Sequence, residues 1–255
     1  MLLGTGLMLT LMVELVAVSG DLGRMNTVFK FYLHAWTLFS VAGAAAFSWL
    51  LGSIHQWNRG WRTFWQASMI VLISGAVLYP LTATPAKIRD RMTSEAPHTL
   101  DGIAYMQSAT HFDLDDEMEL SQDYNAIRWM QDNVQGSPVI VEAQLSEYRW
   151  STRYTIYTGL PGVLGWNWHQ RQQRALIPDS WIWDRVNAID AFYQTTDLDE
   201  TTAFLNKYDV SYIVLGQLER AKYAGDGLVK FEAQNGILWD AVYRDRETVI
   251  YEVRK

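Results

Sequence analysis

Residues 142–174 contain side chains that could bind and act on a phosphorylated sugar. Arg153, Arg171 and Arg174 offer planar guanidinium forks that match the oxygens of a phosphate or diphosphate. Trp166 and Trp168 have rings large enough to stack on a sugar, and the ordinary pKa of a histidine would allow His169 to serve as a general base. The candidate substrate-binding residues in this segment are Glu142, Tyr148, Arg153, Trp166, His169, Arg171 and Arg174.

A purely structural role explains the same residues. Arg153 and Arg174 could pair with Glu142 and Asp184 inside a folded domain, the tryptophans could be core residues, and a hydrogen-bonded structural histidine is the stronger interpretation of His169. The chain has no HExxH, GxSxG or P-loop motif, so its catalytic residues stay unknown. Both interpretations remain open at this stage.

A second candidate set lies near the amino terminus, where a polar stretch at 20–30 separates two apolar runs. Glu14 falls inside an apolar segment, where a carboxylate is costly and usually faces a partner or a polar cavity. One interpretation is a polar cavity at the outer ends of helices, suited to a lipid phosphate or a metal. The other is an interhelical pair of Glu14 with Arg24 or His34. The candidates for the cavity are Glu14, Asp21, Arg24, Asn26 and Lys30.

Three apolar runs predict the elements that hold this second set. Residues 1–19, 31–54 and 65–81 are each long enough to predict a transmembrane helix. A secretory signal is a poorer explanation of the first run, because a basic leading region is missing and Glu14 interrupts the apolar stretch. The loop at 55–64 has two arginines and no acid, so the positive-inside rule places it in the cytoplasm. We therefore expect a multi-pass protein of the cell membrane with residues 84–255 outside the cytoplasm.

Charge separates these runs from the rest of the chain. Residues 1–83 hold four Lys or Arg and two acids, whereas 84–255 hold 17 basic and 26 acidic residues. The expected domains are a transmembrane region at 1–83 and a soluble domain at 84–255. An acidic domain is a poor match for the phosphates of nucleic acid, so nucleic acid is not an expected partner. The chain has no cysteine, which excludes disulfides, thiolate nucleophiles and Cys-ligated metals.

Residue patterns in 84–255 predict an α/β domain with a mixed sheet. Helical spacing at 121–134, 181–194, 199–209 and 217–224 alternates with strands at 137–143 and 210–216 and a closing hairpin at 237–253. The stretch 153–166 is expected to form a strand, a turn and a second strand. The acidic stretch 113–123 lacks the ligand spacing of an EF-hand and is expected to be a solvated linker.

Several ordered motifs resemble one family. They include "RMNTVFKFYLHAW" (24–36), "DYNAIRWMQDNVQGSPVIVEA" (123–143), "YTGLPGVLGWNWHQRQQR" (157–174) and "KYDVSYIVLGQLER" (207–220). This order resembles the carboxy-terminal portion of the YYY membrane-protein family (domain of unknown function 2298), which is similar to GT-C glycosyltransferases. Gln170 and Gln173 stand where the family tends to have a glutamate and an aromatic residue, so this chain has an amide in place of that carboxylate.

The resemblance implies transfer of a sugar from a polyprenyl-phosphate donor to an extracytoplasmic glycan acceptor, with a divalent metal as a possible cofactor. GT-C enzymes place a catalytic acid in the first extracytoplasmic loop, which this chain would not contain, so we expect it to be inactive alone and to work with an upstream membrane subunit. The bilayer is an expected partner. The alternative is a non-catalytic membrane-anchored module whose outer domain binds a glycan or a partner subunit.

Overall fold

The computed structural model of this 255-residue chain describes residues 1–18, 24–92, 95–174 and 176–255. The chain divides into two compact units, Met1–Asp90 and Arg91–Lys255, and each has a fold of its own.

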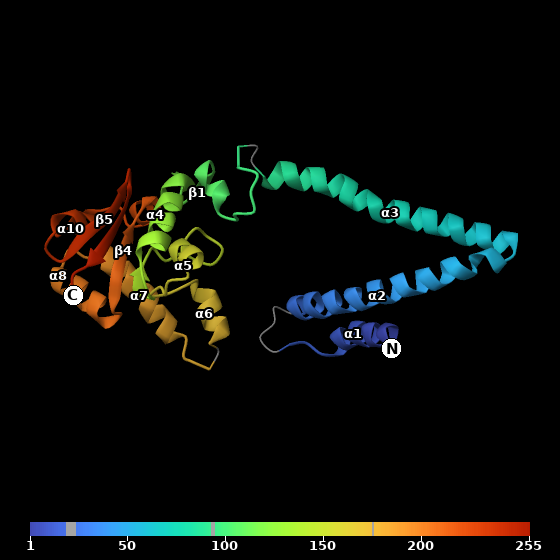
Figure 1. The fold of residues 1–255 in the computed structure, drawn as a ribbon. Helices are drawn as coiled ribbons and strands as arrows, with labels where there is room; N and C mark the ends of the chain where they lie inside the picture. The colour runs from blue at the N-terminus through green and yellow to red at the C-terminus, as the bar shows by residue number, and fades with distance from the viewer. Residues whose placement is uncertain (19–23, 93–94, 175) are drawn as a thin grey trace. The chain divides into compact units, whose positions relative to one another are not determined.

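The amino-terminal unit is helical. It contains α1 (Leu2–Leu15), α2 (Met25–Ser53), the short 3-10 helix η1 (Ile54–Gln56) and α3 (Arg59–Arg91). Helix α1 lies beside α2 (Figure 1), and the two are so close that a Cβ atom on Gly6 would stand 2.6 Å from the ring of Phe39. Small residues allow this kind of close helix contact.

Two of the three predicted membrane spans have the length and composition that a span requires. Met25–Gln56 and Arg59–Arg91 are long and apolar enough to cross a bilayer, and they contain the runs predicted at 31–54 and 65–81. The first predicted span is shorter than expected, because α1 ends at Leu15 and its 14 residues fall below the roughly 20 that a spanning helix needs.

The carboxy-terminal unit is an α/β domain with a mixed sheet. Its four-stranded sheet has the order β3-β4-β6-β5, with β3 and β4 parallel and the other pairs antiparallel, and β1 and β2 form a separate hairpin. The elements are η2 (Ala104–Gln107), β1 (Thr110–Asp113), β2 (Asp116–Glu119), α4 (Leu120–Asn133), β3 (Val139–Val141), α5 (Arg153–Thr158), α6 (Asn167–Gln173), α7 (Ser180–Gln194), α8 (Leu198–Lys207), β4 (Val210–Leu215), α9 (Gln217–Lys222), η3 (Asp226–Leu228), α10 (Val229–Ala233), β5 (Trp239–Asp245) and β6 (Thr248–Val253).

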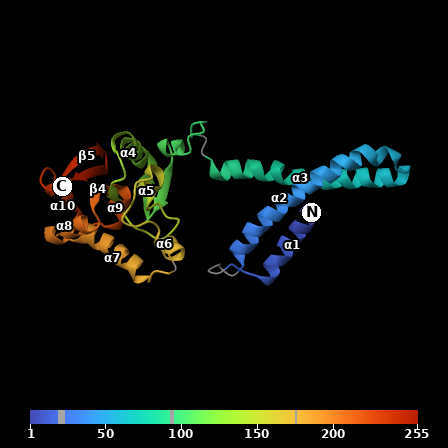
Figure 2. The ribbon, with the colours of Figure 1, turned by 60° about the horizontal axis from the view of Figure 1, so that its bottom comes forward.

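Helices cover both faces of the sheet. Successive strand residues point to opposite faces, so Val214 packs with α4 and α5 while its neighbour Ile213 packs with α7 and α8. In Figure 2, α4 lies above β4 and α7 lies below it. The domain is therefore a sheet between two helical layers, and the connection from β3 to β4 carries α5, α6, α7 and α8.

Two local predictions were wrong. The stretch 113–123 is not a solvated linker: it contains the turn and second strand of the β1–β2 hairpin and the start of α4. Leu114 and Asp115 both have positive φ, 53° and 65°, which suits a tight hairpin turn.

The first half of 153–166 is also not a strand. Arg153–Thr158 is the helix α5, which ends at Gly159 with a φ of 76°. The second half pairs with β3 only locally, through Ile140 N–H donating to Pro161 O and Val163 N–H donating to Ile140 O. The backbone that follows α5 thus runs along the edge of the sheet without becoming a regular strand.

Candidate functional site

Arg153 is the centre of a buried ion cluster. Its Nε donates to Asp123 Oδ2 at 2.7 Å, and its two terminal nitrogens donate to the Glu219 carboxylate at 2.9 and 3.2 Å. Glu142 lies 3.7 Å away, and the exposed fraction of Arg153 is 1%. The interpretation of Arg153 as half of an ion pair within the domain is therefore what the structure contains, with two carboxylates beyond the expected Glu142.

Glu142 caps the helix that carries Arg153. Its carboxylate accepts the backbone N–H groups of Tyr154 and Thr155 at 3.0 and 2.9 Å and the Thr155 hydroxyl at 2.9 Å. Those amides belong to the first turn of α5 and have no partner within the helix. A buried carboxylate on the loop after β3 thus stabilises a helix at 153–158, where the residue pattern had indicated a strand.

The pKa values of the groups in this cluster are shifted in different directions. Burial alone would lower the pKa of Arg153, but the charges of Asp123 and Glu219 raise it well above its usual value. Burial raises the pKa of Glu142 more than Arg153 and the capping amides lower it. Burial also opposes ionisation of Glu219, yet the charge and hydrogen bonds of Arg153 lower its pKa overall. Arg153 is consequently a fixed internal charge, and its guanidinium is shielded from solvent.

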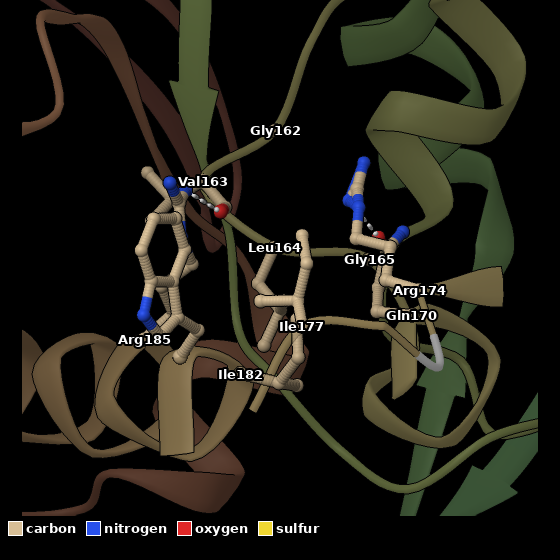
Figure 3. Close-up of a pocket in the computed structure, with 10 residues that line it drawn as sticks. Gly162, Val163, Leu164, Gly165, Gln170, Arg174, Ile177, Ile182 and Arg185 are labelled. Atoms are coloured by element: carbon tan, nitrogen blue, oxygen red, sulfur yellow. Dashed lines mark hydrogen bonds between the residues drawn. The ribbon is translucent and has the colours of Figure 1, made fainter. Parts of the chain in front are cut away.

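Arg174 lies in a different environment, at a pocket between the 162–165 segment and helices α6 and α7. The pocket has a volume of about 250 Å³ and is formed by Gly162, Val163, Leu164, Gly165, Gln170, Arg174, Ile177, Trp181, Ile182 and Arg185. Figure 3 shows Arg174 on one side with Gly165 and Gln170, Arg185 on the other side with Val163, and the side chains of Leu164, Ile177 and Ile182 between them.

Both pocket arginines are held by neutral oxygens. Arg174 donates to Gln170 Oε1 at 3.1 Å, and Arg185 donates to the backbone carbonyl of Val163 at 2.8 Å. Among the residues that the structure describes, no carboxylate lies within ion-pair distance of either guanidinium, so Arg174 does not pair with Asp184. A Cβ atom on Gly162 would stand 2.6 Å from Thr155 Oγ1, so the wall of the pocket requires glycine there.

Three of the candidate substrate-binding residues form an aromatic cluster beside α6. The Tyr148 hydroxyl lies 2.8 Å from His169 Nε2, and the rings of Tyr148 and His169 each have their centroids 5.6 Å from that of Trp166. His169 is thus hydrogen-bonded, as the structural interpretation expected. Tyr148 has a φ of 64°, a strained backbone for a residue other than glycine.

Arg171 points away from the pocket arginines toward other tryptophans. Its guanidinium carbon lies 5.1 Å from the ring centre of Trp168 and 5.0 Å from that of Trp183, and it contacts Asp179 at 3.5 Å. The exposed fractions of the two rings are 38% and 42%, so these tryptophans are not core residues.

Two of the amino-terminal candidates form an ion pair. Arg24 donates to Glu14 Oε2 at 2.7 Å and to the carbonyl of Val13 at 3.2 Å, which is the interhelical pair that the second interpretation expected. Asn26 and Lys30 lie in the first turns of α2. Asp21 lies outside the described residues.

The local sequence does not reveal the distant acidic partners of these side chains. Asp123 and Glu219 were not singled out, because nothing local distinguishes a buried acid from the solvated ones around it. Trp181 and Arg185 were available as a signal: they are four positions apart in a predicted helix and therefore share a face.

The family resemblance implies a divalent metal, which would need a group of suitable side chains. Over the described parts of the chain, no group of three or more His, Cys, Asp or Glu side chains could hold a metal ion.

Comparison with protein families gives a match at the amino terminus. Residues 1–39 match a family described as an uncharacterized membrane protein (DUF2298). The family description and the two candidate spans together identify a membrane protein. The resemblance to the YYY family is thereby confirmed at the amino terminus.

Among solved structures, the chain is similar to the C-terminal globular domain of an oligosaccharyltransferase from Archaeoglobus fulgidus. The identity is 13%, the TM-score is 0.34, and the match covers 51% of this chain and 95% of that one. A similarity of this size supports no conclusion about function. No curated protein matches the chain.

Proposed function

We propose that this membrane protein binds a sugar phosphate in the α6–α7 pocket of its carboxy-terminal domain, as the recognition part of glycosyl transfer of the GT-C kind. The observation that carries the proposal is the pair of pocket arginines, Arg174 and Arg185, which face a cavity without a carboxylate partner among the described residues. Guanidinium groups in such a position bind phosphate oxygens through charge-assisted hydrogen bonds.

The remaining lining fits the sugar. Trp181 supplies an aromatic ring, Gln170 supplies an amide, and the apolar side chains between the two arginines form a surface on which a ring can rest. The phosphate would contact Arg174, whose guanidinium is held only by the flexible side chain of Gln170 among the described residues. Arg185 is more firmly oriented because its partner is a backbone carbonyl.

The pocket is assigned to binding and not to the chemical step. Among the described residues, its lining includes no carboxylate and no histidine that could activate an acceptor hydroxyl. The family resemblance supports a polyprenyl-phosphate sugar as the natural ligand and an extracytoplasmic position for residues 84–255. The other candidate function is a non-catalytic glycan-binding module, and the exposed rings of Trp168 and Trp183 favour it.

The experiment is a titration of the full chain in nanodiscs with glucose 1-phosphate, inorganic phosphate and glucose. We expect glucose 1-phosphate to bind more tightly than either half of the molecule alone. Arg174→Gln should weaken its binding by about tenfold or more, because a charge-assisted hydrogen bond is lost. Arg171→Gln is the matched control, since Arg171 lies in α6 outside the pocket lining and Arg174 is the residue that follows this helix.

Two results would contradict the proposal. One is equal affinity of the Arg174→Gln variant and the unmodified chain for glucose 1-phosphate. The other is a failure of both phosphate-containing probes to bind. Binding of glucose with the same affinity as glucose 1-phosphate would favour the glycan-binding module instead.

A further inference from the structure

Helices α6 and α7 meet at a corner of the domain that presents large apolar side chains to solvent. Leu176 is fully exposed, and the exposed fraction of the Trp181 side chain is 61%. We use the name α6–α7 corner for the described residues Trp168, Leu176, Ile177, Trp181 and Trp183, all of which are exposed. Single exposed apolar residues are ordinary, but several large ones on and between two helices that contact each other indicate an interaction surface.

The charge around this corner differs from that of the rest of the domain. Residues 166–185 contain three arginines and two aspartates, whereas residues 84–255 contain 17 basic and 26 acidic residues. Arg171 is held between the rings of Trp168 and Trp183, so a cation is fixed within the aromatic patch. Residues 166–185 thus have a net charge of +1, with Arg171 paired to Asp179 at 3.5 Å, so this segment repels an anionic surface less than the rest of the acidic domain does.

The segment between α3 and η2 limits how far the domain can lie from a bilayer. Helices α2 and α3 are candidate membrane spans in the same polypeptide, and only residues 92–103 separate α3 from η2. Twelve residues extend at most about 40 Å, and a domain of this size has a radius of gyration of about 15 Å. The connecting segment is therefore long enough for the domain surface to contact a bilayer that holds α3.

We infer that the α6–α7 corner docks on the bilayer surface. Trp168, Trp181 and Trp183 lie at the level of the headgroups, Leu176 and Ile177 enter the boundary with the acyl chains, and Arg171 contacts anionic headgroups. Tryptophan favours this region because its ring is apolar and its N–H is polar. Insertion of a few apolar side chains next to cations is also how surface-bound helices attach to membranes. Ile177 and Trp181 also line the pocket, but the inference needs no ligand there and does not depend on the proposed function.

The absence of native cysteine allows a direct test on the full chain. A Leu176→Cys variant is labelled with an environment-sensitive fluorophore and reconstituted in vesicles of equal parts phosphatidylcholine and phosphatidylglycerol. The matched control is Ile237→Cys, an exposed apolar position before β5 in the same domain. Both positions are on the surface, so the substitutions leave the core unchanged.

We expect a quencher carried on the lipid acyl chains to remove most of the fluorescence at position 176 and little of that at position 237. Iodide in the water phase should give the reverse order. Equal quenching of the two positions by the lipid quencher would overturn the inference. Protection of position 176 from both quenchers would also overturn it, because the corner would then be covered by protein.

Discussion

Two arginines of this domain, Arg153 and Arg174, have the same side chain and opposite surroundings. Arg153 is 1% exposed and contacts three carboxylates. One of them, Glu142, also accepts a backbone N–H group at the start of the helix that carries Arg153. Arg174 is exposed at the edge of a pocket and contacts one neutral amide. The first guanidinium has its binding capacity satisfied by the fold, whereas the second retains donors for a ligand.

The difference shows how to separate a structural cation from a binding one. Taking a charge out of water is costly, so a buried arginine survives only where opposite charges and hydrogen bonds surround it. An arginine at a pocket carries no such requirement, because solvent stabilises it until a ligand arrives. The carboxylates around a guanidinium therefore predict its role better than the arginine itself does.

The largest effect is expected from removing the buried cation. Arg153→Leu would leave Asp123, Glu142 and Glu219 buried without their counter-charge, which should lower the free energy of unfolding by about 3–5 kcal/mol. Denaturant unfolding of the full chain, followed by near-ultraviolet circular dichroism, measures this. Arg174→Gln is the control, and an equal loss of stability in both variants would show that the two arginines do not differ.

A smaller effect, with a distinctive pH dependence, is expected within the buried cluster. Burial raises the pKa of Glu142 above its ordinary value of 4.5, so the folded state binds its proton first and stability increases as the pH falls toward 4.5. Glu219 has the opposite sign: burial opposes its ionisation, but Arg153 lowers its pKa, so stability is lost as the pH falls below 4.5.

The measurement is the unfolding midpoint of the full chain as a function of pH. Glu142→Gln should remove the increase above pH 4.5, and Glu219→Gln should remove the loss below it. A curve that keeps both slopes in both variants would show that the pH dependence arises elsewhere in the molecule.

The aromatic side of the pocket should contribute less than its cations. Trp181→Ala is expected to weaken glucose 1-phosphate binding by about threefold to tenfold, because ring contacts contribute about 0.5–1.5 kcal/mol. The affinity for inorganic phosphate should not change, since that probe has no ring to stack. A parallel loss for both probes would mean that the tryptophan shapes the pocket and does not contact the sugar.

The smallest effect is expected at Arg171. Its ion pair with Asp179 spans 3.5 Å, the Asp179 side chain is 61% exposed, and surface pairs contribute about 0–1 kcal/mol. Arg171→Gln should therefore leave the unfolding midpoint and the affinity for glucose 1-phosphate nearly unchanged. A loss comparable with that of Arg153→Leu would place Arg171 among the structural cations.

Local patterns predicted much of the domain. Helices at 181–194 and 199–209, a strand at 210–216 and a hairpin at 237–253 all appear as α7, α8, β4 and the β5–β6 pair. The apolar runs at 31–54 and 65–81 likewise appear within α2 and α3. These elements depend on periodicity and on turn residues, which neighbouring positions in the chain already contain.

The structures of the two segments that were predicted wrongly depend on distant residues. The segment 153–158 has a strand-like composition, but the Glu142 carboxylate accepts its first two free amides and stabilises a helix. The segment 113–123 is acidic, yet its Asp123 is buried because Arg153 and the Trp150 indole donate to it. Neither partner is visible in the local pattern.

The amino-acid sequence by itself therefore determined the separation into apolar and acidic parts, most of the secondary structure and the presence of arginines and tryptophans near α6. Only the tertiary structure decided which of those arginines is enclosed and which faces a pocket. The physical reason is that burial and ion pairing are set by residues far apart in the chain: Arg153 and Glu219 are separated by 66 positions and meet only because the fold brings helix α5 against helix α9.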